Sequence, residues 1–131
     1  MITLPNFSPD ELRCKGSGLL ILAPAFGQAL QGLRDAMGEA MTLNSACRSK
    51  AHNTSVGGHP RSLHVCDHPY WNTGGCCAVD VRAPEGEMDP YRAKLAEIAW
   101  VRGWSIGFHP QFLHLDLRTA YIGRAQARFN Y

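Results

Sequence analysis

Apolar residues recur at helical spacing in three stretches of the chain. A short helix is expected to begin after Ser8, because this residue is a good N-cap and Pro9 suits the first helical position. A longer helix is predicted over residues 24–38, and a third over residues 89–102, where Asp-Pro opens the helix and a glycine follows it. The apolar stripe of the second helix consists of Phe26, Leu30, Leu33 and Met37. These helices are expected to flank a small sheet.

Four other stretches alternate or cluster in the way that buried strands do. They are residues 41–47, 78–82, 104–108 and 112–118. Residues 49–75 separate the first two strands, are rich in Gly, Pro, Asn, Ser and His, and show no periodicity; connections this long inside a compact domain are usually functional. The tail from Thr119 carries no strong signal. The pattern predicts a single α+β domain over residues 1–131, with a small, mainly antiparallel sheet and flanking helices.

The last predicted strand carries two polar side chains that can bind a metal. Strand alternation places His114 and Asp116 on one face, with Phe112, and leucines on the other. Burying a histidine and an aspartate side by side is costly unless they are paired or bind a cation. With His64 and Asp80 from other segments, two imidazoles and a carboxylate would make an open zinc site with one position left for water.

Composition narrows the classes of function. Charged residues make up 18% and apolar residues 45% of the 131 positions, which is typical of a globular chain. The formal net charge is only +2, without long runs of Lys or Arg, so neither a nucleic-acid nor a membrane partner is expected. Residues 19–26 form an apolar run too short to span a bilayer. The first residues do not have the pattern of a signal peptide, which predicts a protein made in a cytosol.

The five cysteines are an odd number and do not indicate a disulfide framework in that compartment. Cys14 and Cys47 lie in apolar surroundings and are expected to be buried. Cys66, Cys76 and Cys77 bracket one loop. They leave two alternatives open: a thiolate-rich second zinc site completed by His68, or a disulfide that closes the loop outside the cell.

Several of these residues follow one another in the order of a known family. Arg48 ends the first strand, Ser62-x-His64 follows, then Ala-x-Asp80 in the second strand, and His114 comes late. This order resembles the zinc D-Ala-D-Ala carboxypeptidases and related peptidoglycan peptidases, including phage endolysins. The same superfamily contains lysostaphin-type enzymes and the hedgehog signalling domain. Its pattern is Ser-x-His-x-x-Gly-x-Ala-x-Asp followed by a distal His.

The resemblance covers residues 43–118 and implies a function. It implies that His64, Asp80 and His114 bind zinc and that the substrate is a bacterial peptidoglycan peptide. A small enzyme of this kind is expected to be a phage or prophage product. It would be made in the cytoplasm of the infected or producing bacterium and would reach the cell wall after release, or within a virion together with other virion proteins.

The spacing departs from the family pattern in one loop. Fifteen residues separate His64 from Asp80, more than the pattern contains, and the extra residues form an insertion over positions 66–75. Because the cost of closing a loop grows slowly with its length, the insertion need not disturb the ligands. Tyr70 and Trp71 in the insertion are expected to line the substrate cleft, since aromatic residues with polar handles suit half-buried surfaces.

A second departure concerns the general base. Many members have an acid three residues before the distal histidine, and Gln111 stands there in this chain. Glutamine cannot accept the proton of a water molecule. Asp116 is the first candidate to replace it, and its alternative role is to orient His114. His109 is the second candidate.

Arg48 and Ser62 are the remaining residues that the resemblance singles out. Arg48 is expected to bind the carboxylate or carbonyl of the substrate, with local surface pairing as the alternative. Ser62 would bind substrate or cap its loop. His52, His59 and His68 are interpreted as loop histidines.

The expected activity is metal-assisted amide hydrolysis, in which Asp116 accepts a proton from water and Arg48 positions the substrate. The missing acid at Gln111 leaves two alternatives without catalysis. One is a domain that keeps the zinc and binds the cell wall but has no turnover, as is the case for the hedgehog relatives. The other is a structural metal domain of a virion.

Overall fold

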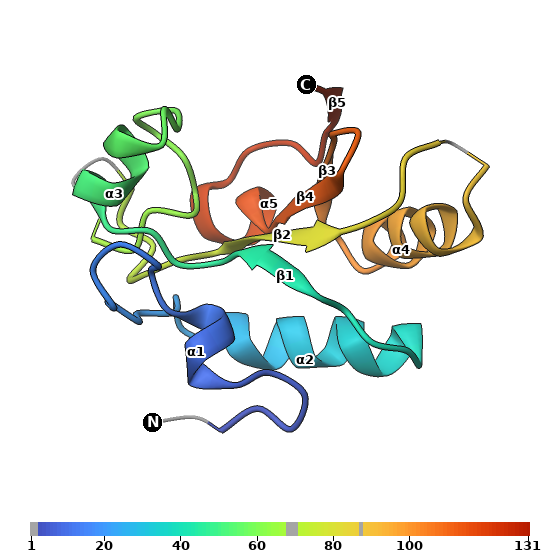
Figure 1. The fold of residues 1–131 in the computed structure, drawn as a ribbon, viewed down its shortest axis with the longest axis horizontal. Coiled ribbons are helices and arrows are strands. Elements are labelled where there is room, and N and C mark those ends of the chain that lie inside the picture. Colours follow the sequence, from blue (N-terminus) through green and yellow to red (C-terminus); the bar gives the residue numbers. More distant parts are fainter. Residues whose placement is uncertain (1–2, 68–70, 87) are drawn as a thin grey trace.

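The computed structural model describes residues 3–67, 71–86 and 88–131 (Figure 1). Its helices are α1 (Pro9–Leu12), α2 (Phe26–Met37), α3 (Lys50–Ser55), α4 (Pro90–Val101) and α5 (Arg118–Ile122). Its strands are β1 (Leu43–Ser45), β2 (Ala78–Arg82), β3 (Ser105–Phe108), β4 (Phe112–Asp116) and β5 (Arg128–Asn130). Within this described part of the chain, none of the helices has the length and apolar character needed to cross a membrane.

The five strands form one mixed sheet in the order β1-β2-β4-β3-β5. Three of its four pairings are antiparallel, and β5 joins the edge of the sheet parallel to β3. In Figure 1, α1 and α2 lie below the sheet, α3 lies at the upper left and α4 at the right. The α+β fold with a mainly antiparallel sheet is thus confirmed.

The core lies between α2, α4 and one face of the sheet. The predicted stripe of α2 is fully buried, and the ring of Phe26 meets the ring of Trp104 edge-on at 5.6 Å between centroids. Leu113 and Leu115 of β4 enter the same core. Strand alternation therefore turns Phe112, His114 and Asp116 toward the opposite face.

Three short elements were not predicted from the sequence. Helix α3 occupies part of the stretch interpreted as irregular, and the hydroxyl of Ser49 caps it by accepting the N–H of His52 at 3.2 Å. Helix α5 and strand β5 lie in the tail that showed no strong signal. Elements of five residues or fewer depend on tertiary contacts more than on local propensity, which explains why α5 and β5 escaped the pattern.

The ends of two predicted strands also need correction. The first strand is shorter than residues 41–47, because only β1 pairs with β2, with an irregularity in the register. The last strand ends at Asp116, because Arg118 already begins α5.

Truncating Leu115 should destabilise the whole domain, because this side chain fills the core directly behind the polar face of β4. We expect Leu115→Ala to lower the free energy of unfolding by about 2–5 kcal/mol, as buried leucine truncations do. Val101 is 79% exposed, so Val101→Ala should change the free energy of unfolding by less than about 0.5 kcal/mol. Urea unfolding followed by circular dichroism measures both variants. Equal effects would contradict this description of the core.

Candidate metal centre

The register of β2 and β4 places two candidate ligands side by side. Asp80 lies directly opposite His114 in this antiparallel pair. Both side chains are on the face that turns away from the core leucines. Asp80 is 4% exposed and His114 is 8% exposed. Two polar groups so deeply buried need partners.

His64 reaches the same place from an irregular segment. The N–H of Arg48 donates to the carbonyl of His64 at 2.9 Å, and the N–H of Cys77 donates to the carbonyl of Leu63 at 3.0 Å. These bonds hold the segment between the end of β1 and the start of β2. The hydroxyl of Ser62 accepts the N–H of His64 at 3.2 Å. This bond corresponds to the second role considered for Ser62, which is to cap its own loop.

One ligand atom from each of His64, Asp80 and His114 lies within 4.8 Å of the other two. Atom Oδ1 of Asp80 is 3.1 Å from Nε2 of His64 and 3.1 Å from Nδ1 of His114. His64 is only 2% exposed. Two imidazole nitrogens and a carboxylate oxygen that converge in a buried place form a donor set that fits a divalent transition metal.

The other polar atom of each ligand is held by the protein. His64 donates from Nδ1–H to the carbonyl of Ala46 at 2.7 Å, which leaves Nε2 to face Asp80. The second oxygen of Asp80 accepts a hydrogen bond from the guanidinium of Arg48 at 3.2 Å. Such bonds fix the tautomer and the direction of metal ligands. Arg48 is therefore a structural partner of the site as well as a lining residue.

His114 is held by a carboxylate that is itself fully engaged. Its Nε2–H donates to Oδ2 of Asp116 at 2.8 Å. Arg118 binds the same carboxylate with Nε on Oδ1 at 2.9 Å and a terminal nitrogen on Oδ2 at 2.8 Å, and its backbone N–H adds a bond to Oδ1 at 3.0 Å. With both oxygens occupied, Asp116 has the geometry of a group that orients His114.

The pKa shifts follow from this network. Burial lowers the pKa of His64, which keeps its imidazole in the neutral form that binds metals. Burial acts to lower the pKa of His114, but hydrogen bonds to Asp116 and Asp80 outweigh it and raise the pKa. Burial likewise acts to raise the pKa of Asp116, while His114 and Arg118 lower it to about 2. Asp116 is thus ionised at neutral pH. Its pKa is far below the value near the working pH that suits a general base.

The three candidate ligands line a cavity of about 690 Å³. Arg48, Ser62 and Trp71, which the sequence analysis predicted to bind substrate, lie in its wall. Tyr70 and His68 lie outside the described residues. The wall also contains residues that the sequence analysis did not assign to it: His59, Arg118, Arg124, Phe129 and Tyr131.

The C-terminal strand supplies the aromatic part of this wall. A side chain on Gly107 would collide with the ring of Phe129, at 2.5 Å from its nearest atom. Glycine at this position lets Phe129 approach His114 to 5.9 Å between ring centroids, and the guanidinium of Arg118 lies 5.1 Å from the same ring. An alternating pattern, Arg-Phe-Asn-Tyr, was the only signal for this strand in the sequence.

Gln111, at the position of the usual acid, and His109, the second candidate for the general base, lie elsewhere. Gln111 and His109 line other hollows of the surface, and neither is among the residues that line the metal cavity. The ring of His109 stacks on that of Phe112 at 4.1 Å between centroids, and its Nδ1 accepts the N–H of Gln111 at 3.1 Å. The fallback assignment of the base to His109 finds no support in this geometry.

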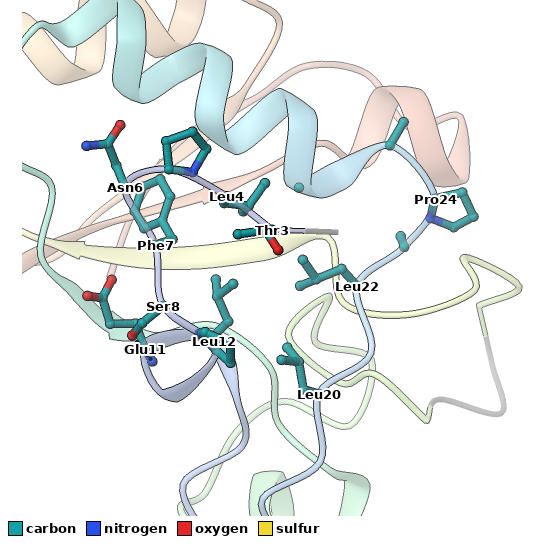
Figure 2. A pocket seen from close by; sticks show the side chains of 15 residues that line it. Thr3, Leu4, Asn6, Phe7, Ser8, Glu11, Leu12, Leu20, Leu22 and Pro24 are labelled. Atoms are coloured by element: carbon teal, nitrogen blue, oxygen red, sulfur yellow. Dashed lines mark hydrogen bonds between the residues drawn. The ribbon is translucent and has the colours of Figure 1, made fainter. Parts of the chain in front are cut away.

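A larger cavity, of about 850 Å³, has a lining that shares no residue with that of the metal cavity (Figure 2). Figure 2 shows Leu4, Phe7, Leu12 and Leu22 around it, from the N-terminal segment, α1 and the stretch before α2. Among the described residues, its wall contains no histidine or cysteine. It therefore has no imidazole or thiol donor that could join a metal ligand such as the carboxylate of Glu11.

A family model described as Peptidase M15 matches residues 5–116. The chain belongs to the peptidase M15 family. A search of the curated proteins found no match. Peptidases of the M15 family are metal-dependent, and the His64–Asp80–His114 group is the place where this chain could bind the metal. The match ends at Asp116, so the segment that carries Arg118, Arg124 and Phe129 lies beyond it.

Removing a ligand should remove the metal. We expect wild-type protein to hold one metal ion per chain, and His64→Ala and His114→Ala to hold much less, because two donors cannot retain what three buried donors bind. His59→Ala is the matched control, since His59 lines the cavity outside the ligand group. Elemental analysis after gel filtration gives the stoichiometry, and circular dichroism checks folding. Full metal content in folded His114→Ala would contradict the assignment.

Replacing Asp116 should weaken metal binding, because an asparagine has one accepting oxygen instead of two and cannot accept all four hydrogen bonds from His114 and Arg118. We expect Asp116→Asn to lower metal affinity about 10–100-fold, as other changes to the partners of metal ligands do. Asp35→Asn, on the exposed side of α2, is the control. Competition with a chromogenic chelator measures the affinity. Unchanged affinity with a loss of about 10²–10⁴-fold in turnover would instead identify Asp116 as the general base.

Proposed function

We propose that the protein is a zinc-dependent peptidase that hydrolyses amide bonds in bacterial peptidoglycan peptides. One observation carries the proposal: three converging donors from His64, Asp80 and His114 lie in the wall of an open cavity. Two histidines and one carboxylate, with room for a further ligand, are typical of catalytic zinc sites. Zinc bound there would polarise the scissile carbonyl and activate a water molecule.

The charges of the cavity wall support a substrate with a carboxylate. Arg48, Arg118 and Arg124 line the cavity together with the carboxylates of Asp80 and Asp116. Each aspartate is already paired with an arginine, so the wall keeps a surplus of positive charge even before a metal is counted. Guanidinium groups bind planar carboxylates in a bidentate manner. Peptidoglycan peptides carry such carboxylates, including one at the free end of a D-Ala-D-Ala stem.

Arg48 would serve two purposes in this proposal. Its guanidinium holds Asp80, and Nε donates to the hydroxyl of Ser45 at 3.1 Å while a terminal nitrogen donates to the amide oxygen of Asn53 at 3.3 Å. Three partners fix the guanidinium at the edge of the cavity. There it can hold the carbonyl or carboxylate of the peptide without a further loss of side-chain freedom.

Asp116 would keep Nδ1 of His114 directed into the site by holding the proton on Nε2.

Trp71 lines the same cavity. Its indole N–H donates to the carbonyl of Arg61 at 2.9 Å, and the guanidinium of Arg124 lies 5.6 Å from its ring. This aromatic and cationic rim would cover the bound peptide and exclude water from the carbonyl to be cleaved.

The proposal extends to a phage or prophage origin, with action on the cell wall after release or within a virion. This part rests on the resemblance of the ordered motifs to phage endolysins. The alternative from another class is a zinc-containing domain that binds the wall without turnover. The residue that favours this alternative is Gln111, which stands at the position of the usual acid.

Hydrolysis of purified peptidoglycan tests the proposal. Wild-type protein loaded with zinc should release new amino and carboxyl groups, 1,10-phenanthroline should stop the reaction, and added zinc should restore it. Stem peptides with a free C-terminal carboxylate should be cleaved faster than their C-terminal amides, because the arginines favour the charged form. His114→Ala is the inactive control. Stoichiometric zinc and wall binding without any released amine would support the binding domain instead.

A further inference from the structure

Three buried cysteines form a cluster of their own beside the metal centre. Cys47, Cys66 and Cys76 contact one another in a small apolar cluster that is separate from the main core, and the three leucines 19, 20 and 22 pack against it. Cys47 directly precedes Arg48, Cys66 follows His64 by two residues, and Cys76 precedes β2. The thiols therefore join the three segments that carry the residues of the site.

Cys47 is the central member of this cluster. The Cys66 thiol lowers the pKa of Cys47, while the Cys76 thiol and burial raise it, with a net pKa of about 12. The Cys47 thiol and burial in turn raise the pKa of Cys66. Cys47 packs with both of these cysteines in the buried cluster. Cys77 differs, because it packs into the main core.

The three thiols do not converge on a point in the way that metal ligands do. In the described part of the chain, the only group of three or more His, Cys, Asp or Glu residues with all ligand atoms within 4.8 Å is His64–Asp80–His114. Cys47, Cys66 and Cys76 are not such a group. Their chemistry is therefore that of a pair of thiols, with Cys47 as one member.

Two observations select Cys66 as the partner. The segments of Cys47 and Cys66 are already hydrogen-bonded: the N–H of Arg48 donates to the carbonyl of His64, and the N–H of Cys66 donates to the carbonyl of Arg48, both at 2.9 Å. Cys66 is also the most exposed of the three, at 6%, whereas Cys76 is fully buried and its thiol donates to the carbonyl of Ala78 at 3.1 Å. An oxidant would reach Cys66 first.

We propose that Cys47 and Cys66 are an oxidation site that forms a disulfide when the folded chain meets a small disulfide such as oxidised glutathione. The sulfur of Cys66 attacks the oxidant and forms a mixed disulfide, with release of one glutathione thiol. The sulfur of Cys47 then attacks that of Cys66 and releases the second glutathione. The two cysteines lose two protons and two electrons in total, and the S–S bond of the oxidant is reduced to two thiols.

The cross-link would close the segment that forms one wall of the cavity. Residues 48–65 lie between the two cysteines and contain Arg48, α3 and His64. A covalent bond would add to the hydrogen bonds that already join the two ends of this segment, and it would restrict the unfolded chain. The inference does not depend on the proposed peptidase activity.

The full-length, metal-loaded protein is incubated with oxidised and reduced glutathione at a series of ratios. Remaining thiols are then blocked, and the protein is digested without reduction. Trypsin separates Cys47 from Cys66 by cleaving after Arg48 and Arg61, and a protease that cleaves before Asp67 separates Cys66 from Cys76 and Cys77. We expect a linked pair of peptides with Cys47 and Cys66, and a fall from five free thiols to three in denaturant. The midpoint of thermal unfolding should rise by about 10 °C.

Alanine variants provide the controls. Cys77→Ala should still lose two thiols, because Cys77 belongs to the main core, whereas Cys66→Ala should form no such link. The peptide map of the wild-type protein decides the matter even where a variant folds poorly. A link from Cys47 to Cys76, a link to Cys77 or Cys14, stable glutathione adducts alone, or five unchanged thiols would each overturn the proposal.

Discussion

The pairing of β2 with β4 is the constraint on which the site depends. It sets Asp80 opposite His114 and places Leu113 and Leu115 on the other side of the sheet. Because side chains alternate along a strand, a slip of one residue would turn His114 into the core and a leucine into the cavity. The apolar core therefore fixes the register, and through the register it fixes the distance between two of the three metal donors. Stability and chemistry are linked in this one strand pair.

Burial of so many polar groups is tolerable only because each one has a partner. His64 is hydrogen-bonded to the carbonyl of Ala46, Asp80 to the guanidinium of Arg48, and His114 to the carboxylate of Asp116. A buried charge without a partner would cost several kcal/mol, so these bonds are a condition for folding as well as for function. They also leave one atom of each ligand facing its neighbours. The same network that makes the burial possible prepares the site for a cation.

The irregular segment that carries His64 and the C-terminal strand β5 complete the site. The clasp between Arg48 and His64 carries a ligand from an irregular segment to the sheet, and the Cys47 cluster packs beside that clasp. At the opposite edge, β5 lays Phe129 over Gly107. The M15 match ends at Asp116, before α5 and β5. The metal donors thus belong to the part of the chain that the family shares, while much of the aromatic and cationic wall comes from residues beyond it.

The sequence by itself determined the α+β class, the long helices α2 and α4, the capped start of α1, and the face of β4 that carries His114 and Asp116. These features follow from local periodicity and capping, which a linear pattern records directly. It also singled out His64, Asp80 and His114 through the order of the motifs. The metal that they bind and the role of each remain predictions. Only the tertiary structure decided that His64 reaches the other two, that Arg118 occupies both oxygens of Asp116, and that Cys47, Cys66 and Cys76 lie in one buried cluster. Helix α3, helix α5 and strand β5 were missed for a related reason: they are short, and contacts with distant residues stabilise them. Pairings between residues far apart in the chain depend on sheet register and packing, and neither is written in the local alternation of polar and apolar residues.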